Sequence, residues 1–224
     1  MEWREREHEA NDLAALADLA AMQDLTTCGL LKYWLIPGMK AQGDLMTWLV
    51  RTWNVYEQGF VIVNHCVTIN ADEIYFLIGL CHRGANLSLF EQRMGGDTTD
   101  GYLRRFCRGA PPKDDRIDIH TIKLFPLRTI TFTVCKMCGS PTLPLATRAY
   151  MQVVMECWES TVYNWCEVVV MNMKRQLTSC KNGKLKNLGY GNILVSFVLE
   201  RIPILQPQQI LADEGWPTDP HMMR

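Results

Sequence analysis

The chain of 224 residues carries a formal net charge of −1, with 48% hydrophobic and 21% charged residues. This is the composition of a folded globular protein, and it excludes an intrinsically disordered chain. The balanced charge excludes a strongly basic, obligate nucleic-acid binder, and the lack of an apolar run of roughly 18 residues excludes a membrane-spanning helix.

The N-terminal part is predicted to form two helices followed by a strand. Leucine and alanine at helical spacing indicate a helix within residues 2–25, which Gly29 is expected to end. Asp44 is expected to cap a second helix over residues 45–55, because its carboxylate can accept hydrogen bonds from the first backbone N–H groups. The β-branched and aromatic run at residues 60–63 is typical of a short strand.

The sharpest local signal follows this strand. Asn70 precedes Glu73 by three residues, which is the spacing of a capping box, and the pair predicts a helix over residues 71–81. Glycines and prolines predict that residues 83–118 are mostly loop. The apolar, threonine-rich stretch at residues 119–137 fits a strand or a helix equally well.

The longest pattern covers residues 147–177, where apolar side chains recur at helical spacing over four turns and predict one continuous helix. A further apolar segment lies at residues 193–199, before a proline-rich end. We therefore predict a mainly α, compact multi-helix globular domain with one or two short strands. It is predicted to comprise an N-terminal helical extension (1–27), a helical domain (28–205) and a Pro-rich flexible tail (206–224).

The nine cysteines are odd in number, scattered and mostly set among apolar residues. This usage favours reduced thiols in an intracellular protein over a disulfide framework. Cys135 and Cys138 have the C-x-x-C spacing of half a zinc site or of a redox pair. Because no second such pair follows, buried thiols are the favoured interpretation. A zinc site completed in the fold by Cys157, His120 or His65 stays open.

Motifs that would identify an enzyme are missing from the sequence. There is no phosphate-binding Walker loop, no nucleophile elbow and no zinc-protease helix, and the five histidines form no short motif with a cysteine. We predict no catalytic residue, no metal site and no cofactor. A Cys- or metal-dependent enzyme remains a lesser alternative, because clusters assembled by folding are invisible in a sequence.

The candidate binding set is basic. Five cations share a stretch that is free of acidic side chains: Lys174, Arg175, Lys181, Lys184 and Lys186. Such a patch can neutralise phosphates and release their counterions without reading sequence, so DNA or RNA is the partner that it would bind. The residues themselves favour the other interpretation, a solvated helix end, where cations suit the negative end of the helix dipole. A second set, between Arg83 and Arg108, is interrupted by acidic residues and is the weaker candidate.

Residues 67–80, VTINADEIYFLIGL, followed by Gly84, resemble the signature of the plant mobile domain, a family of transposon-associated plant proteins also called aminotransferase-like. In that signature a Thr-Ile pair is followed by an acidic residue, an aliphatic residue and a Leu-x-Gly-Leu ending. The lead-in at residues 45–60 and the segment from Glu200 to Pro203 are also similar to the family. The resemblance covers roughly residues 28–205.

The resemblance implies a helical domain of plant origin, association with mobile elements and, in domesticated members, nuclear roles in genome silencing and development. The expected function is a non-enzymatic, transposon-derived module that associates with nucleic acid or chromatin. It is expected in the nucleus or the cytoplasm, and the resemblance favours the nucleus. The alternative is a protein–protein interaction scaffold without nucleic-acid contact. The aminotransferase-like name implies no chemistry for this chain, because none of its lysines has a recognisable cofactor-binding context.

Overall fold

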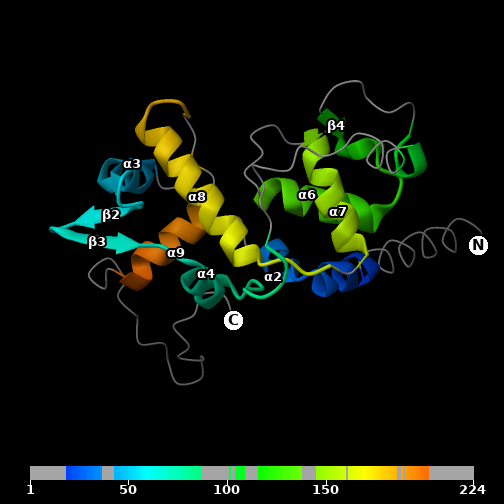
Figure 1. Cartoon of the computed structure of the whole chain (residues 1–224), viewed down its shortest axis with the longest axis horizontal. Helices are drawn as coiled ribbons and strands as arrows, with labels where there is room; N and C mark the ends of the chain where they lie inside the picture. Colours follow the sequence, from blue (N-terminus) through cyan, green and yellow to red (C-terminus); the bar gives the residue numbers. More distant parts are fainter. Residues whose placement is uncertain are drawn as a thin grey trace, which may run out of the picture. The chain divides into compact units, whose positions relative to one another are not determined.

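The computed structural model describes residues 19–36, 43–86, 101, 104–108, 116–137, 145–159, 161–185, 188 and 190–201. The chain divides into two compact units (Figure 1). Unit 1 comprises Met1–Leu35 and Leu80–Val168, and unit 2 comprises Ile36–Gly79 and Val169–Arg224. Most of the described elements are helices, which confirms the predicted mainly α class. No helix in these ranges is both long and apolar enough to cross a bilayer.

The first described element of unit 1 is a helix over residues 19–27. Gly29 ends it as expected. The φ of this glycine is +75°, and the N–H of Leu30 donates to the carbonyl of Leu25 at 2.7 Å, which closes the last turn. Helix α2 (Leu31–Trp34) follows directly. The predicted boundary at residue 27 stays a prediction, and the predicted tail lies outside the described residues.

The core of unit 1 lies between two helices, α6 (Phe125–Met137) and α7 (Arg148–Trp158), which pack against each other. Two short strands pair antiparallel beside these helices: β4 (Arg116–Asp118) precedes α6 in the chain, and β5 (Leu145–Thr147) directly precedes α7. Val154 of α7 is fully buried. The strand pair and the contact between α6 and α7 therefore place the two helices side by side.

Helix α6 resolves the ambiguity of residues 119–137. A 3-10 turn, η1 (Ile119–Thr121), precedes it, residues 122–124 are not helical, and residues 125–137 form the α-helix. Threonine made the stretch resemble a strand, but the buried hydroxyls of Thr131 and Thr133 each donate to the carbonyl four residues earlier, at 2.7 and 2.8 Å. These bonds satisfy polar groups that would otherwise be costly to bury, so threonine is compatible with the helix interior here.

The prediction of one continuous helix over residues 147–177 is wrong. α7 ends at Trp158, and α8 (Trp165–Lys181) is a separate helix. Between them, Tyr163 forms a parallel β-bridge with Ala85, and the Ala85 N–H donates to the carbonyl of Val162 at 3.0 Å. Pairing with a segment far away in sequence therefore holds the chain extended where the apolar periodicity alone would continue the helix.

A local signal does mark this break. Asn164 accepts a hydrogen bond from the N–H of Glu167 at 3.2 Å, so it starts α8 in the same way that Asn70 starts its helix. Thr161 and Val162, which precede it, are β-branched and favour an extended backbone over a helix. The Asn-x-x-Glu spacing at residues 164–167 is visible in the sequence, but the longer apolar pattern that runs through it obscures the signal.

Unit 2 contains a three-stranded antiparallel sheet in the order β1-β2-β3, with strands β1 (Trp53–Asn54), β2 (Gly59–Ile62) and β3 (His65–Thr68). β2 confirms the predicted strand. The sequence did not indicate its two partners, because neither has the apolar alternation of a half-buried strand. α3 (Gly43–Thr52) precedes the sheet and packs against β2.

Helix α3 differs from its prediction at both ends. It starts at Gly43, so Asp44 lies in its first turn rather than at the N-cap position. A carboxylate there still suits the positive end of the helix dipole. At the other end the helix stops at Thr52, because Trp53 pairs with Phe60 in the sheet.

The core of unit 2 is aromatic. Trp53 and Phe60, both buried, meet edge to face with their ring centroids 5.1 Å apart. Phe197 of α9 (Gly191–Arg201) packs on Phe60 at 6.0 Å. The indole N–H of Trp53 donates to Thr178 Oγ1 of α8 at 3.1 Å, so its one polar group is satisfied. These contacts tie the sheet to the two C-terminal helices.

The predicted capping of α4 (Ala71–Ile78) is confirmed. The side chain of Asn70 accepts a hydrogen bond from the N–H of Glu73 at 3.0 Å. The helix ends three residues earlier than predicted because Gly79 adopts a left-handed conformation, with φ at +65°. The segment that resembles the plant mobile domain therefore corresponds to β3, this capped helix and its glycine end.

Candidate functional site

The predicted basic set is spread over two sides of α8 and the turn beyond it. Lys174 and Lys181 are seven residues apart, so they share one side of the helix, about 10 Å apart along its axis. Lys174 is half-buried, whereas Arg175, on a different side of the helix, is exposed. Lys184 is exposed in the turn after the helix, and Lys186 lies outside the described residues. The helix therefore does not present these cations as one face.

The structure adds Arg51 to this region. The Lys181 ammonium donates a hydrogen bond to the backbone carbonyl of Arg51, in the last turn of α3. Both side chains are exposed, as is Lys184. We call Arg51, Lys181 and Lys184 the α8-end cluster. Sequence reasoning missed Arg51 because it precedes Lys181 by 130 positions, and only folding brings the two helix ends together.

A second basic group, in unit 1, is better organised. An antiparallel β-bridge joins Cys107 to Ile122. On either side of it, the Arg108 N–H donates to Thr121 O and the Lys123 N–H donates to Phe106 O, both at 2.8 Å. Arg108 and Lys123, which flank this bridge, are exposed, as are Arg104 and Arg105 in the helical turn just before it, and we call these four cations the bridge cluster.

The exposure of Arg108 and Lys123 follows from strand geometry. Side chains alternate between the two faces of an extended pair. Cys107 and Ile122 point inward and are 4% and 0% exposed, so their neighbours Arg108 and Lys123 point outward on the opposite face. These two are diagonal neighbours across the bridge, a position in which side chains lie within reach of one another. Of the set that the sequence ranked as weaker, the fold places Arg108 near Lys123, a cation that belonged to neither predicted set.

A histidine and two phenylalanines also contribute to this surface. His120 is exposed beside the ladder, and its backbone N–H is bonded to the carboxylate of Asp118 at 2.9 Å. Arg105 lies over the ring of Phe106, 5.1 Å from its centroid. Phe125 is 42% exposed at the start of α6. The surface therefore combines cations with exposed aromatic area.

The cysteines do not come together as a metal site in the described part of the chain, where no three His, Cys, Asp or Glu side chains could hold an ion. Cys135 is fully buried in α6, and burial raises its pKa to about 12. Cys138 lies outside the described residues. Folding brings Cys157 to Cys28, and the hydrogen bond from Cys157 lowers the pKa of Cys28. This pairing of two buried thiols was not visible in the sequence.

Thiol reactivity should separate exposed Cys66 from buried Cys135. A hydrogen bond with Glu57, together with the charge of that carboxylate, raises the pKa of the Cys66 thiol. Glu57→Gln should therefore lower this pKa, increase the thiolate fraction at pH 8 and speed alkylation of Cys66 by iodoacetamide several-fold. Cys135 should stay unmodified until the protein is denatured. Peptide mass spectrometry over time measures both, and equal rates for the two cysteines in native protein would contradict the prediction.

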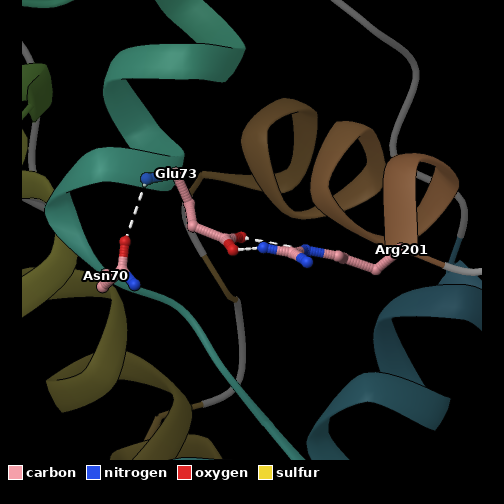
Figure 2. Close-up of polar contacts among 3 residues, drawn as sticks. All are labelled: Asn70, Glu73 and Arg201. Carbon is pink, nitrogen blue, oxygen red and sulfur yellow. Dashed lines mark hydrogen bonds and ion pairs between the residues drawn. The ribbon is translucent and has the colours of Figure 1, made fainter.

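A pocket of about 510 Å³ opens between α4 and α9 in unit 2. Its walls carry Asp72, Glu73 and Phe76 from the first helix and Glu200 and Arg201 from the second. Figure 2 shows the guanidinium of Arg201 reaching across to the carboxylate of Glu73, with which it forms an ion pair. The same Glu73 uses its backbone N–H to complete the cap with Asn70. Glu73 therefore takes part both in the N-terminal cap of α4 and in the wall of the pocket.

Comparison of the chain with protein-family models, curated proteins and solved structures finds no match in any of the three. The resemblance to the plant mobile domain therefore stays a prediction that rests on residues 67–84.

Proposed function

We propose that this chain is a non-enzymatic, transposon-derived module that associates with nucleic acid or chromatin in the nucleus, through cations that fold into local surfaces. The observation that carries the proposal is the β-bridge between Cys107 and Ile122, which sets the exposed cations Arg108 and Lys123 diagonally across from each other on a chain whose net charge is only −1. Arg104 and Arg105 are exposed in the adjoining helical turn. The α8-end cluster, which contains Lys181 and Lys184 of the predicted set, supplies a second contact in unit 2.

The chemistry expected of such surfaces is sequence-independent. Each arginine or lysine that neutralises a phosphate releases condensed counterions, so affinity depends steeply on salt. The guanidinium groups can donate two parallel hydrogen bonds to one phosphate, and the exposed ring of Phe125 can stack on an unpaired base. These features support association with the phosphate backbone or with single strands.

The test is a salt titration with a fluorescent DNA duplex and the matching single strand, followed by anisotropy. Changing both Arg108 and Lys123 to alanine should weaken binding and reduce the slope of log affinity against log salt by about 0.9 for each duplex phosphate that is no longer neutralised. Arg51→Ala with Lys184→Ala tests the α8-end cluster in the same way. Lys32→Ala, which removes an exposed cation from α2, is the matched control and should leave the slope unchanged.

The outcomes separate the two surfaces. An unchanged slope after the Arg108 and Lys123 changes would remove the bridge cluster from the proposal. A loss confined to the Arg51 and Lys184 variant would instead assign binding to the α8-end cluster. No salt-dependent binding by the unaltered protein would contradict the function itself and favour a scaffold that contacts proteins alone.

A further inference from the structure

The pocket between α4 and α9 differs from the basic surfaces in its charge. Three of the residues that line it are acidic, Asp72, Glu73 and Glu200, and one, Arg201, is basic, so the lining carries a net charge of −2. A phosphate or any other polyanion would be repelled there. The pocket is therefore a different kind of binding feature from the surfaces proposed to contact nucleic acid.

The ion pair already present divides the acidic residues into two roles. Glu73 is 12% exposed and its charge is neutralised by Arg201, so this ion pair holds α4 and α9 together at the wall of the pocket. Asp72 and Glu200 are exposed and contribute the remaining negative charge. The acidic charge left over at the rim is thus available to a ligand, and it is carried by one residue from each helix.

The inner surface of the pocket is apolar. Leu77 and Phe197 line it, and Phe197 is 2% exposed because its ring is packed into the aromatic core of unit 2. Phe76 is 60% exposed on the same lining. A large aromatic ring at the edge of an acidic pocket attracts a cation both through the negative face of the ring and through the carboxylates.

We propose that this pocket binds a short basic segment of a partner protein, with one arginine side chain seated against Phe76 and near the carboxylates of Asp72 and Glu200. Charge complementarity selects the occupant, because the rim keeps two negative charges after the internal ion pair is formed. An arginine suits the lining best, since its alkyl stem packs on leucine and phenylalanine while its guanidinium bonds to carboxylate. The volume, about 510 Å³, is within the range that holds a few side chains.

The experiment uses a fluorescent short peptide with three arginines and a matched peptide in which citrulline replaces each arginine. Citrulline keeps the shape of arginine and removes its charge. The full chain should bind the arginine peptide saturably, bind the citrulline peptide much more weakly, and lose affinity as salt is added, since exposed charges are screened. Fluorescence anisotropy measures all three results.

Substitutions then locate the binding. Asp72→Asn and Glu200→Gln should each weaken the arginine peptide by about 2- to 5-fold, as expected for one exposed ion pair. Phe76→Ala should weaken it by a similar factor of about 2- to 5-fold, because the cation–π interaction is removed. Glu57→Gln and Tyr56→Ala are matched controls, because both side chains are exposed in the β1–β2 turn of the same unit and outside the pocket lining. They should leave the affinity unchanged.

Several results would overturn the proposal. Equal binding of the citrulline peptide would remove the role of charge, and equal losses in the Glu57 and Tyr56 controls would move binding out of the pocket. Self-association of the protein that Asp72→Asn abolishes, and that excludes the peptide, would assign the pocket to a second copy of this chain. Circular dichroism of each variant verifies that it is folded. Because the probe is cationic, failure here leaves the nucleic-acid proposal and its test unaffected.

Discussion

Replacing Trp165 with alanine is expected to destabilise unit 1 by about 3 to 5 kcal/mol, the usual cost of deleting a buried aromatic side chain. Trp165 is 0% exposed, and its indole N–H donates to the backbone carbonyl of Cys28 at 2.6 Å. Its ring packs on Tyr163, with the centroids 5.4 Å apart. Trp165, the first residue of α8, therefore links this helix to the end of the first helix. Its truncation would leave a cavity and would leave the buried carbonyl of Cys28 without its donor.

Two further variants separate these contributions. Trp165→Phe keeps most of the ring and removes the N–H, so its cost should be about 1 to 3 kcal/mol, the range for a buried polar group left without its partner. Trp34→Ala, at a tryptophan that is 40% exposed, should cost less than the alanine substitution at 165. Urea denaturation followed by circular dichroism measures all three, and equal midpoints for the two alanine variants would contradict the assignment.

Gly84→Ala is expected to cost on the order of 3 kcal/mol, combining a strained backbone with an overpacked contact. Gly84 has a φ of +130°, which L side chains rarely adopt. A Cβ at this position would also lie 2.8 Å from the carbonyl carbon of Val162 and 3.0 Å from that of Tyr163. These are backbone atoms of the segment that pairs with Ala85, so they cannot move aside without breaking the bridge.

Gly43→Ala is the matched control for this glycine. Gly43 lies in α3 with nothing within 4 Å of a Cβ built there, so alanine should leave the stability unchanged or raise it slightly. Thermal denaturation of the two variants under one buffer condition makes the comparison. A Gly84→Ala protein as stable as the parent would show that the close approach to Val162 is not needed for folding.

Local signals predicted the elements that are specified by neighbouring residues. Asn70, Glu73 and Gly79 all act within one short helix, so the start of α4 was predictable and its end could have been. The break between α7 and α8 has a local signal at Asn164, but the longer apolar periodicity obscures it, and the pairing of Tyr163 with Ala85 that holds the break open spans nearly eighty positions. Apolar spacing reports which side chains are buried, and it does so whether or not the helix between them is continuous.

The candidate surfaces depend still more on folding. The sequence identified runs of cations by counting, and this favoured the stretch after Lys174. It could not indicate that Lys181 reaches the carbonyl of Arg51, or that a β-bridge sets Arg108 beside Lys123. The acidic pocket is assembled from two helices more than a hundred residues apart, so no motif in either helix could have indicated it.

The division of each unit between two chain segments has a consequence for synthesis. When the ribosome has completed the strands β1 to β3 and helix α4, the C-terminal helices that cover them have not yet been made. Cys28, at the end of the N-terminal helix, also lacks its partner at that stage, because the Trp165 indole that bonds to it is synthesised 137 positions later. Neither unit can therefore complete its fold until its C-terminal segment has been made. A protein cut near residue 80 would leave each unit divided between the two pieces.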